Sequence, residues 1–147
     1  MEITDNHFHL DPNGLQELAV KDFLKAGGTR LVLVNKPYES WKRLEDFKRQ
    51  VKTTLTLAKK AREAGAKVAV VASPHPIDLI KLLDFNNEEE ASEIYTKAVD
   101  FCTNLVNENE IVGLGELGRP HFEVEDRVWR LSNRVLCESL MRAREVD

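Results

Sequence analysis

The pair His7 and His9, in the run DNHFHLD at residues 5–11, is the feature of this sequence with the clearest chemical potential. Side chains alternate along a β-strand, so residues two apart project from the same face, about 7 Å from each other. Two imidazoles at that spacing can converge on one metal ion. Asp5 lies one step earlier on the same face, where its carboxylate could orient an imidazole as a hydrogen-bond acceptor. The spacing predicts a metal site at His7 and His9 supported by Asp5; a chance His-x-His pair is the alternative.

A carboxylate flanked by glycines is the second candidate for a functional residue. Glu116 follows the apolar run 111–114 and lies in VGLGELG, residues 112–118. Glycine is unfavourable in a strand unless space or geometry requires it, so we interpret these glycines as a sign of crowding near a site. We therefore predict Glu116 as a metal ligand and as the catalytic carboxylate. The alternative is a charged loop residue after a strand.

Four apolar runs alternate with four amphipathic stretches. The apolar runs cover 3–10, 31–34, 68–72 and 111–114, and the helical patterns cover 15–26, 41–58, 87–105 and 128–136. Short apolar strands that alternate with helices predict a parallel sheet with right-handed crossovers. The sequence thus predicts an α/β fold, either a small open doubly wound sheet or part of a (βα)8 barrel, which takes about 250 residues.

The unusual polar residues follow these predicted strands. His7 and His9 end the first, Asn35 ends the second, His75 follows the third and Glu116 follows the fourth. In both architectures, functional groups gather at the carboxyl ends of parallel strands. We therefore expect these side chains to meet at one edge of the sheet.

The runs DNHFHLD (5–11) and GELGRPH (115–121) resemble two signatures of the TatD-related metal-dependent hydrolases, which are amidohydrolase-type TIM barrels. The match is most similar to an archaeal branch, in which Gly-Arg-Pro-His replaces Gly-Leu-Asp. The resemblance implies a divalent-metal phosphodiesterase, often a deoxyribonuclease, with one or two Zn, Mn or Mg ions. It implies His7 and His9 as ligands of one ion and Glu116 as a carboxylate that bridges two.

The same resemblance suggests which residues meet the substrate. His75 matches a family position near the substrate phosphate, although a turn residue between two prolines is the alternative. Arg119 and His121 could contact phosphate, or they could form a solvent-exposed loop pair. The implied partner is a phosphodiester or nucleic acid.

The sequence departs from the family pattern in one respect. The remaining family ligands are two histidines and an aspartate on strands five, six and eight, and no histidine follows His121. We therefore predict that residues 1–147 form a single partial TIM-barrel domain, the (βα)4 half of a truncated barrel, whose hydrolase activity is in doubt. A non-catalytic half-barrel that binds metal or self-associates through exposed strand edges is the second hypothesis, and a doubly wound small-ligand module is the third.

Composition and charge indicate how the protein could bind nucleic acid, whether it could span a membrane and where it is located. The formal net charge is −4, which argues against a protein that holds nucleic acid by charge alone. No apolar run approaches the roughly 20 residues of a membrane span, and the acidic N-terminus and two cysteines predict a cytoplasmic protein. We interpret the basic residues of the second helix as a solvated face, Cys102 as core, and Trp41 and Trp129 as packing anchors.

Overall fold

The computed structural model of the chain describes residues 2–146 and is built around a small parallel sheet. Strands β1 (Ile3–Phe8), β2 (Gly28–Val34) and β3 (Lys67–Val71) lie in the order β1-β2-β3. Both neighbouring pairs are parallel. The sheet is not closed, and the fold is a partial (βα) half of a TIM barrel, as predicted from the sequence.

The fourth predicted strand lies beside β3 but is less regular than expected. Its only ladder contact among residues 2–146 is a parallel bridge between Val71 and Gly113. The backbone N–H of Val112 donates to Val70 O at 2.8 Å, and that of Ala72 donates to Gly113 O at 3.3 Å. The segment 111–114 therefore occupies the predicted place at the edge of the sheet without forming a full strand.

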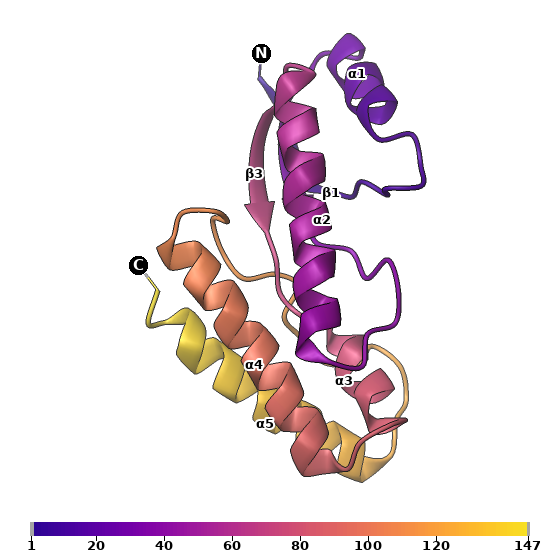
Figure 1. Cartoon of the computed structure of the whole chain (residues 1–147), viewed down its shortest axis with the longest axis vertical. Helices are drawn as coiled ribbons and strands as arrows, with labels where there is room; N and C mark the ends of the chain where they lie inside the picture. The colour runs from indigo at the N-terminus through magenta and orange to yellow at the C-terminus, as the bar shows by residue number, and fades with distance from the viewer. Residues whose placement is uncertain (1, 147) are drawn as a thin grey trace.

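Within the described part of the chain, five helices accompany the sheet: α1 (Glu17–Lys25), α2 (Leu44–Glu63), α3 (Pro76–Leu83), α4 (Glu88–Asn107) and α5 (Asp126–Ala143). Figure 1 shows α2 running along the sheet, with α1 beside one end of it and α4 and α5 packed side by side. None of the helices described is long and apolar enough to cross a membrane.

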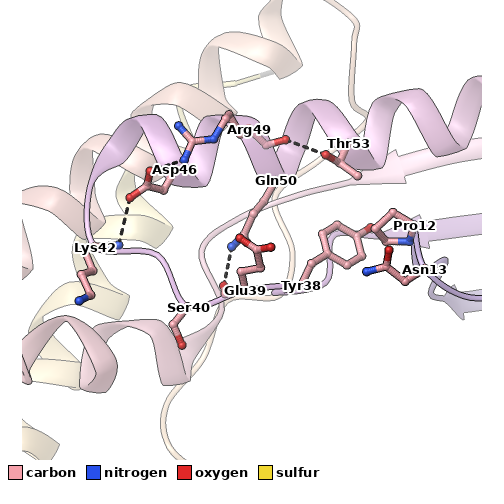
Figure 2. A pocket seen from close by; sticks show the side chains of 10 residues that line it. All are labelled: Pro12, Asn13, Tyr38, Glu39, Ser40, Lys42, Asp46, Arg49, Gln50 and Thr53. Carbon is pink, nitrogen blue, oxygen red and sulfur yellow. Dashed lines mark hydrogen bonds and ion pairs between the residues drawn. The ribbon is translucent and has the colours of Figure 1, made fainter.

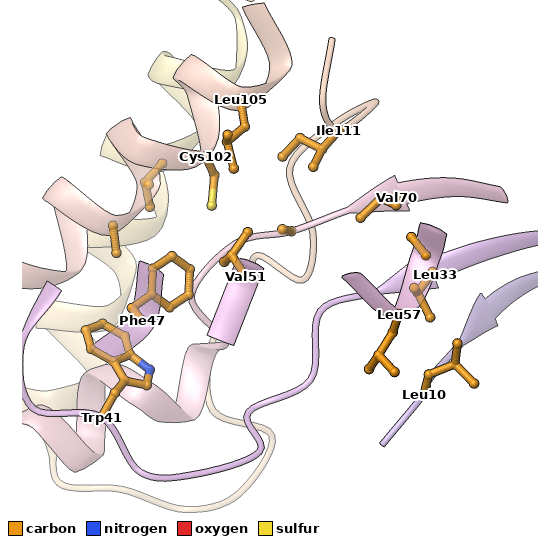
Figure 3. Packing of buried hydrophobic residues seen from close by; sticks show 14 of the residues in the cluster. Leu10, Leu33, Trp41, Phe47, Val51, Leu57, Val70, Cys102, Leu105 and Ile111 are labelled. Carbon is orange, nitrogen blue, oxygen red and sulfur yellow. The ribbon is translucent and has the colours of Figure 1, made fainter. Parts of the chain in front are cut away.

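The core lies between the strands and the helices, chiefly α2 and α4. Figure 3 shows Leu33 and Val70 of the sheet packed near Leu57 of α2, and Cys102 of α4 near Ile111. Cys102 is completely buried, which confirms its predicted place in the core.

The two tryptophans have different surroundings. Trp41 is only 2% exposed and its ring centroid lies 5.1 Å from that of Phe47, so its predicted packing role is confirmed, although it precedes α2 rather than lying within it. Trp129, in the first turn of α5, is 39% exposed. The prediction that Trp129 is a packing anchor is therefore wrong.

Helix α3 was not expected from the sequence, and it begins at one of the candidate site residues. The Nδ1 atom of His75 accepts from the backbone N–H of Ile77 at 3.2 Å, and the Asp78 carboxylate accepts from the backbone N–H of His75 at 2.9 Å. This reciprocal capping box, followed by proline at the first helical position, is a strong start signal. The run His-Pro-Ile-Asp already contained it, hidden by the interpretation of two prolines as a turn.

Candidate metal centre

His7, His9 and Glu116 are brought together by the fold. One potential ligand atom from each lies within 4.8 Å of the others. The Nε2 atoms of His7 and His9 are 3.1 Å apart, and His7 Nε2 is 3.8 Å from Glu116 Oε1. His7 lies in β1 and His9 directly after it, whereas Glu116 follows the segment 111–114 at the other edge of the sheet. A flat sheet would separate these edges by about 14 Å, so the contact requires a sheet that is curved toward this side.

These three groups have the chemistry and spacing to hold a divalent cation. Tetrahedral ligands placed about 2.0–2.1 Å from zinc lie roughly 3.3 Å from each other, which is close to the 3.1 Å between His7 and His9 and the 3.8 Å between His7 and Glu116. All three side chains are at least partly exposed, with 50% exposure for His7 and 37% for Glu116, so their lone pairs are accessible to an incoming ion. The donor set of two imidazoles and one carboxylate is typical of zinc and related metals.

The imidazole of His9 is held in the tautomer that a metal site needs. Its Nδ1 atom lies 3.1 Å from the backbone carbonyl oxygen of Val34, at the end of β2. A carbonyl oxygen can only accept, so Nδ1 carries the proton and Nε2 keeps its lone pair. This is the type of supporting hydrogen bond that orients ligating histidines.

Asp5 makes a different contact from the predicted one. Its carboxylate accepts from the backbone N–H of His7 at 3.0 Å, and no contact with an imidazole is found among the described residues. Strand β1 has an irregular register between Asp5 and Phe8, so simple alternation along the strand does not hold there. Asp5 therefore supports the backbone next to the site, and the Val34 carbonyl takes the orienting role that the sequence suggested for Asp5.

The second oxygen of Glu116 faces a different histidine. Oε2 lies 3.9 Å from His75 Nε2, while the backbone carbonyl of Glu116 accepts from the Ser73 hydroxyl at 2.7 Å. Ser73 is buried and directly follows Ala72, so this hydrogen bond ties the Glu116 loop to the end of β3. Glu116 thus stands between the His7–His9 pair and His75.

The three residues proposed to meet substrate lie around one small pocket. His75, Arg119 and His121 line a cavity of about 180 Å³ together with Glu116, which is its only acidic residue. The Arg119 guanidinium donates to Asn133 Oδ1 of α5 at 3.1 Å and therefore has a fixed position. The pocket thus combines a cation and two imidazoles beside the candidate metal ligand.

The glycines around Glu116 only partly reflect crowding. A Cβ atom at Gly113 would meet nothing within 4 Å, and one at Gly115 would make ordinary contact with Val71 at 3.5 Å. A Cβ at Gly118 would come within 3.2 Å of Pro76 Cγ, at the start of α3. The crowding interpretation is therefore wrong for Gly113 and Gly115 and holds where the Glu116 loop packs against α3.

A buried carboxylate next to the site was missed by the sequence analysis. Asp78 is 3% exposed, and burial raises the pKa of its carboxyl group, partly offset by the Trp41 indole and the backbone N–H of His75. Among residues 2–146, Trp41 Nε1 and Asp78 Oδ1 are both buried without a hydrogen-bond partner. The Tyr95 hydroxyl donates to Pro74 O at 2.8 Å, and burial raises the pKa of Tyr95 strongly. The signal that could have revealed this cluster is the capping position of Asp78.

A second hollow, of about 440 Å³, lies where the loop after β1 meets the start of α2 (Figure 2). Its polar groups are largely paired with each other: Arg49 donates to Asp46 and Gln50 Nε2 donates to Glu39 O at 2.6 Å. Asn35, which directly follows β2, is turned away from the metal candidates and accepts from the buried Thr54 hydroxyl at 2.8 Å. Among the described residues, neither this hollow nor Asn35 therefore contributes a ligand to the site formed by His7, His9 and Glu116.

Comparison with known proteins identifies the family. The family model described as TatD related DNase matches residues 4–147. The uncharacterised protein MJ1127 of Methanocaldococcus jannaschii is 31% identical over 150 residues, which cover 99% of this chain and 52% of that protein. The chain therefore spans about half the length of this relative, and no solved structure matches it. With the candidate ligands within the matched residues, the chain belongs to the TatD-related DNase family of hydrolases.

Proposed function

We propose that this chain binds a divalent metal ion through His7, His9 and Glu116 and forms part of a hydrolase for phosphodiester bonds, with nucleic acid as the substrate. The single observation that carries the proposal is the convergence of two imidazole nitrogens and a carboxylate within 4.8 Å from opposite edges of the sheet. Membership of a family described as DNase supports the phosphodiester as the bond that is cleaved.

Each residue has a distinct part in this proposal. A bound divalent ion would lower the pKa of a coordinated water and stabilise charge on a phosphoryl oxygen. His9 is oriented for ligation by its bond to Val34 O, and Glu116 presents one oxygen toward His7 and the other toward His75. His75, Arg119 and His121 supply N–H donors around the pocket, where a phosphate of the substrate would be positioned.

Metal titration followed by calorimetry tests the ligand set. We expect the double variant His7→Ala/His9→Ala to lower the affinity for Zn²⁺ or Mn²⁺ by at least about 100-fold, because it removes two of three ligands. His121→Ala, which deletes an imidazole from the pocket instead, is the matched control and should retain the affinity. Equal affinities of the double variant and the unchanged chain would refute the assignment.

Hydrolysis of bis(p-nitrophenyl) phosphate then separates the two surviving hypotheses. Metal-dependent turnover that Glu116→Ala abolishes supports the hydrolase. Metal binding without turnover would instead support a non-catalytic half-barrel.

We also propose that isolated chains associate with one another through the open edges of the sheet. Strand β1 and the segment 111–114 each have a neighbour on one side only among the described residues, and Val112 is 67% exposed. Unpaired strand edges are templates for pairing with another chain. Sedimentation velocity at increasing protein concentration tests this, and a monomer at all concentrations would contradict it.

A further inference from the structure

An exposed aromatic surface adjoins the pocket beside Glu116. Phe122 lines that pocket and is 43% exposed, and Trp129 on α5 is 39% exposed. The Arg119 guanidinium carbon lies 5.0 Å from the centre of the Trp129 ring. Arg119 also lines the pocket, so it connects the space next to Glu116 with the indole of α5.

The position of Arg119 is set by two contacts from the same helix. Its guanidinium donates to Asn133 Oδ1 at 3.1 Å and packs over Trp129, one turn earlier on α5. Neither contact neutralises its charge, and Arg119 forms no ion pair among the described residues. A positive charge therefore remains between the pocket and the exposed indole.

This combination has a recognisable ligand chemistry. Aromatic rings beside a cationic group bind the bases of nucleic acids that are not paired, because every base has a π-face and every nucleotide has a phosphate. A guanidinium can contact the phosphate and also stack on an aromatic ring or a base. A packing role does not explain the large exposed fractions of Trp129 and Phe122.

We propose that Trp129, with Phe122 and the guanidinium of Arg119, forms a platform on which an unpaired base of the substrate stacks, next to the phosphate held at Glu116. This inference rests on the proposed function, because it takes a nucleic-acid strand as the substrate. It adds that the strand is recognised through a base as well as through its phosphates. Trp129 is thus a specificity residue: it acts on the base and not on the bond that is cleaved.

Binding of a fluorescein-labelled oligothymidylate of about eight nucleotides, measured by anisotropy in EDTA, tests the platform without cleavage. We expect Trp129→Ala to weaken binding about tenfold and Trp129→Phe to weaken it less than about threefold, because phenylalanine keeps a stacking ring. Phe85→Ala removes a more exposed aromatic ring that lies under Lys42 and does not line the pocket beside Glu116, and this variant should bind as the unchanged chain does. Equal binding by Trp129→Ala and the unchanged chain, or no binding by either, would overturn the proposal.

Fluorescence provides an independent reading because the chain has two tryptophans and only Trp129 is exposed. The oligonucleotide should protect Trp129 from quenching by acrylamide, whereas a fully paired duplex of the same length should protect it much less. Binding without this protection, or equal protection by the duplex, would count against stacking. If Trp129→Ala changes the sedimentation coefficient of the free chain, the surface is an interface between copies, and the proposal is overturned.

The proposed hydrolase activity and the proposed base-stacking platform can be refuted independently of each other. If the chain binds the strand through Trp129 but hydrolyses no phosphodiester in the presence of metal, the platform stands and the hydrolase does not. If bis(p-nitrophenyl) phosphate, which has no nucleobase, is hydrolysed and Trp129→Ala leaves strand binding unchanged, the hydrolase stands and the platform does not.

Discussion

Glu116 and Asp78 approach the same residue, His75, from different sides, and they are used in different ways. Asp78 is 3% exposed and accepts the backbone N–H of His75, whereas Glu116 has a 37% exposed side chain and lies 3.9 Å from His75 Nε2. The Asp78 carboxylate has a structural role, since it caps α3 next to the indole of Trp41. The Glu116 carboxylate has no hydrogen-bonded Lys or Arg beside it among residues 2–146 and remains available to a ligand. Burial, and not residue type, separates the structural carboxylate from the candidate functional one.

Matched amide variants provide the largest expected difference between the two carboxylates. Glu116→Gln should weaken metal binding at least about 100-fold, or about 2.7 kcal/mol, because the amide replaces a charged ligand. Asp78→Asn should leave metal affinity within about threefold, because Asp78 acts only on the backbone of His75. Isothermal titration with Zn²⁺ measures both. Similar losses in the two variants would show that the distinction between them is wrong.

Alanine variants should reverse the order when unfolding is measured. Asp78→Ala should lower the free energy of unfolding by about 2 kcal/mol, because it removes a buried carboxylate that caps α3 through the backbone N–H of His75. Glu116→Ala should change it by less than about 0.5 kcal/mol, as is usual for exposed positions. Urea denaturation in metal-free buffer gives both values. A larger loss for Glu116→Ala than for Asp78→Ala would contradict the comparison.

The smallest expected effect is the contribution of Asp78 to the pH dependence of stability. Its folded pKa is raised above the ordinary 3.8, so the folded state holds the proton more tightly than the unfolded state does. The resulting stabilisation is present below about pH 4 and is lost as pH rises from there through the raised value. His75, Lys81, Trp41 and Tyr95 surround the group, and the first three partly oppose the shift. In Asp78→Asn, the free energy of unfolding should therefore fall less than in the unchanged chain as the pH rises from about 4.

Lowered carboxyl pKa values elsewhere change stability in the opposite direction. Hydrogen bonds and nearby cations lower the pKa of Glu2, Asp11 and Glu93, so their contributions are present above the ordinary values and disappear as pH falls. These groups are identical in Asp78→Asn, so the difference between the two pH profiles isolates Asp78. Identical profiles for the variant and the unchanged chain would mean that folding does not raise the pKa of Asp78.

The sequence predicted most of the architecture because strand and helix periodicities are local. The runs around Val32, Val70 and Val112 and the stripes of α2 and α4 were all recognised, and the family was recognised from two short motifs. Two errors had tertiary causes. The segment 111–114 has the pattern of a strand, but among the described residues it has a partner only on the β3 side. Trp129 was expected to be a packing anchor, but it is 39% exposed.

The sequence by itself determined that His7 and His9 lie side by side at the end of one strand and that Glu116 ends another element. Spacing along a single segment predicted both facts, although the irregular register of β1 between Asp5 and Phe8 departs from simple alternation. Only the tertiary structure decided that Glu116 reaches His7 from the opposite edge of the sheet, that Val34 O orients His9, and that Asp78 is buried. Sheet curvature and burial depend on how all the elements pack together, so no local pattern of residues encodes them alone.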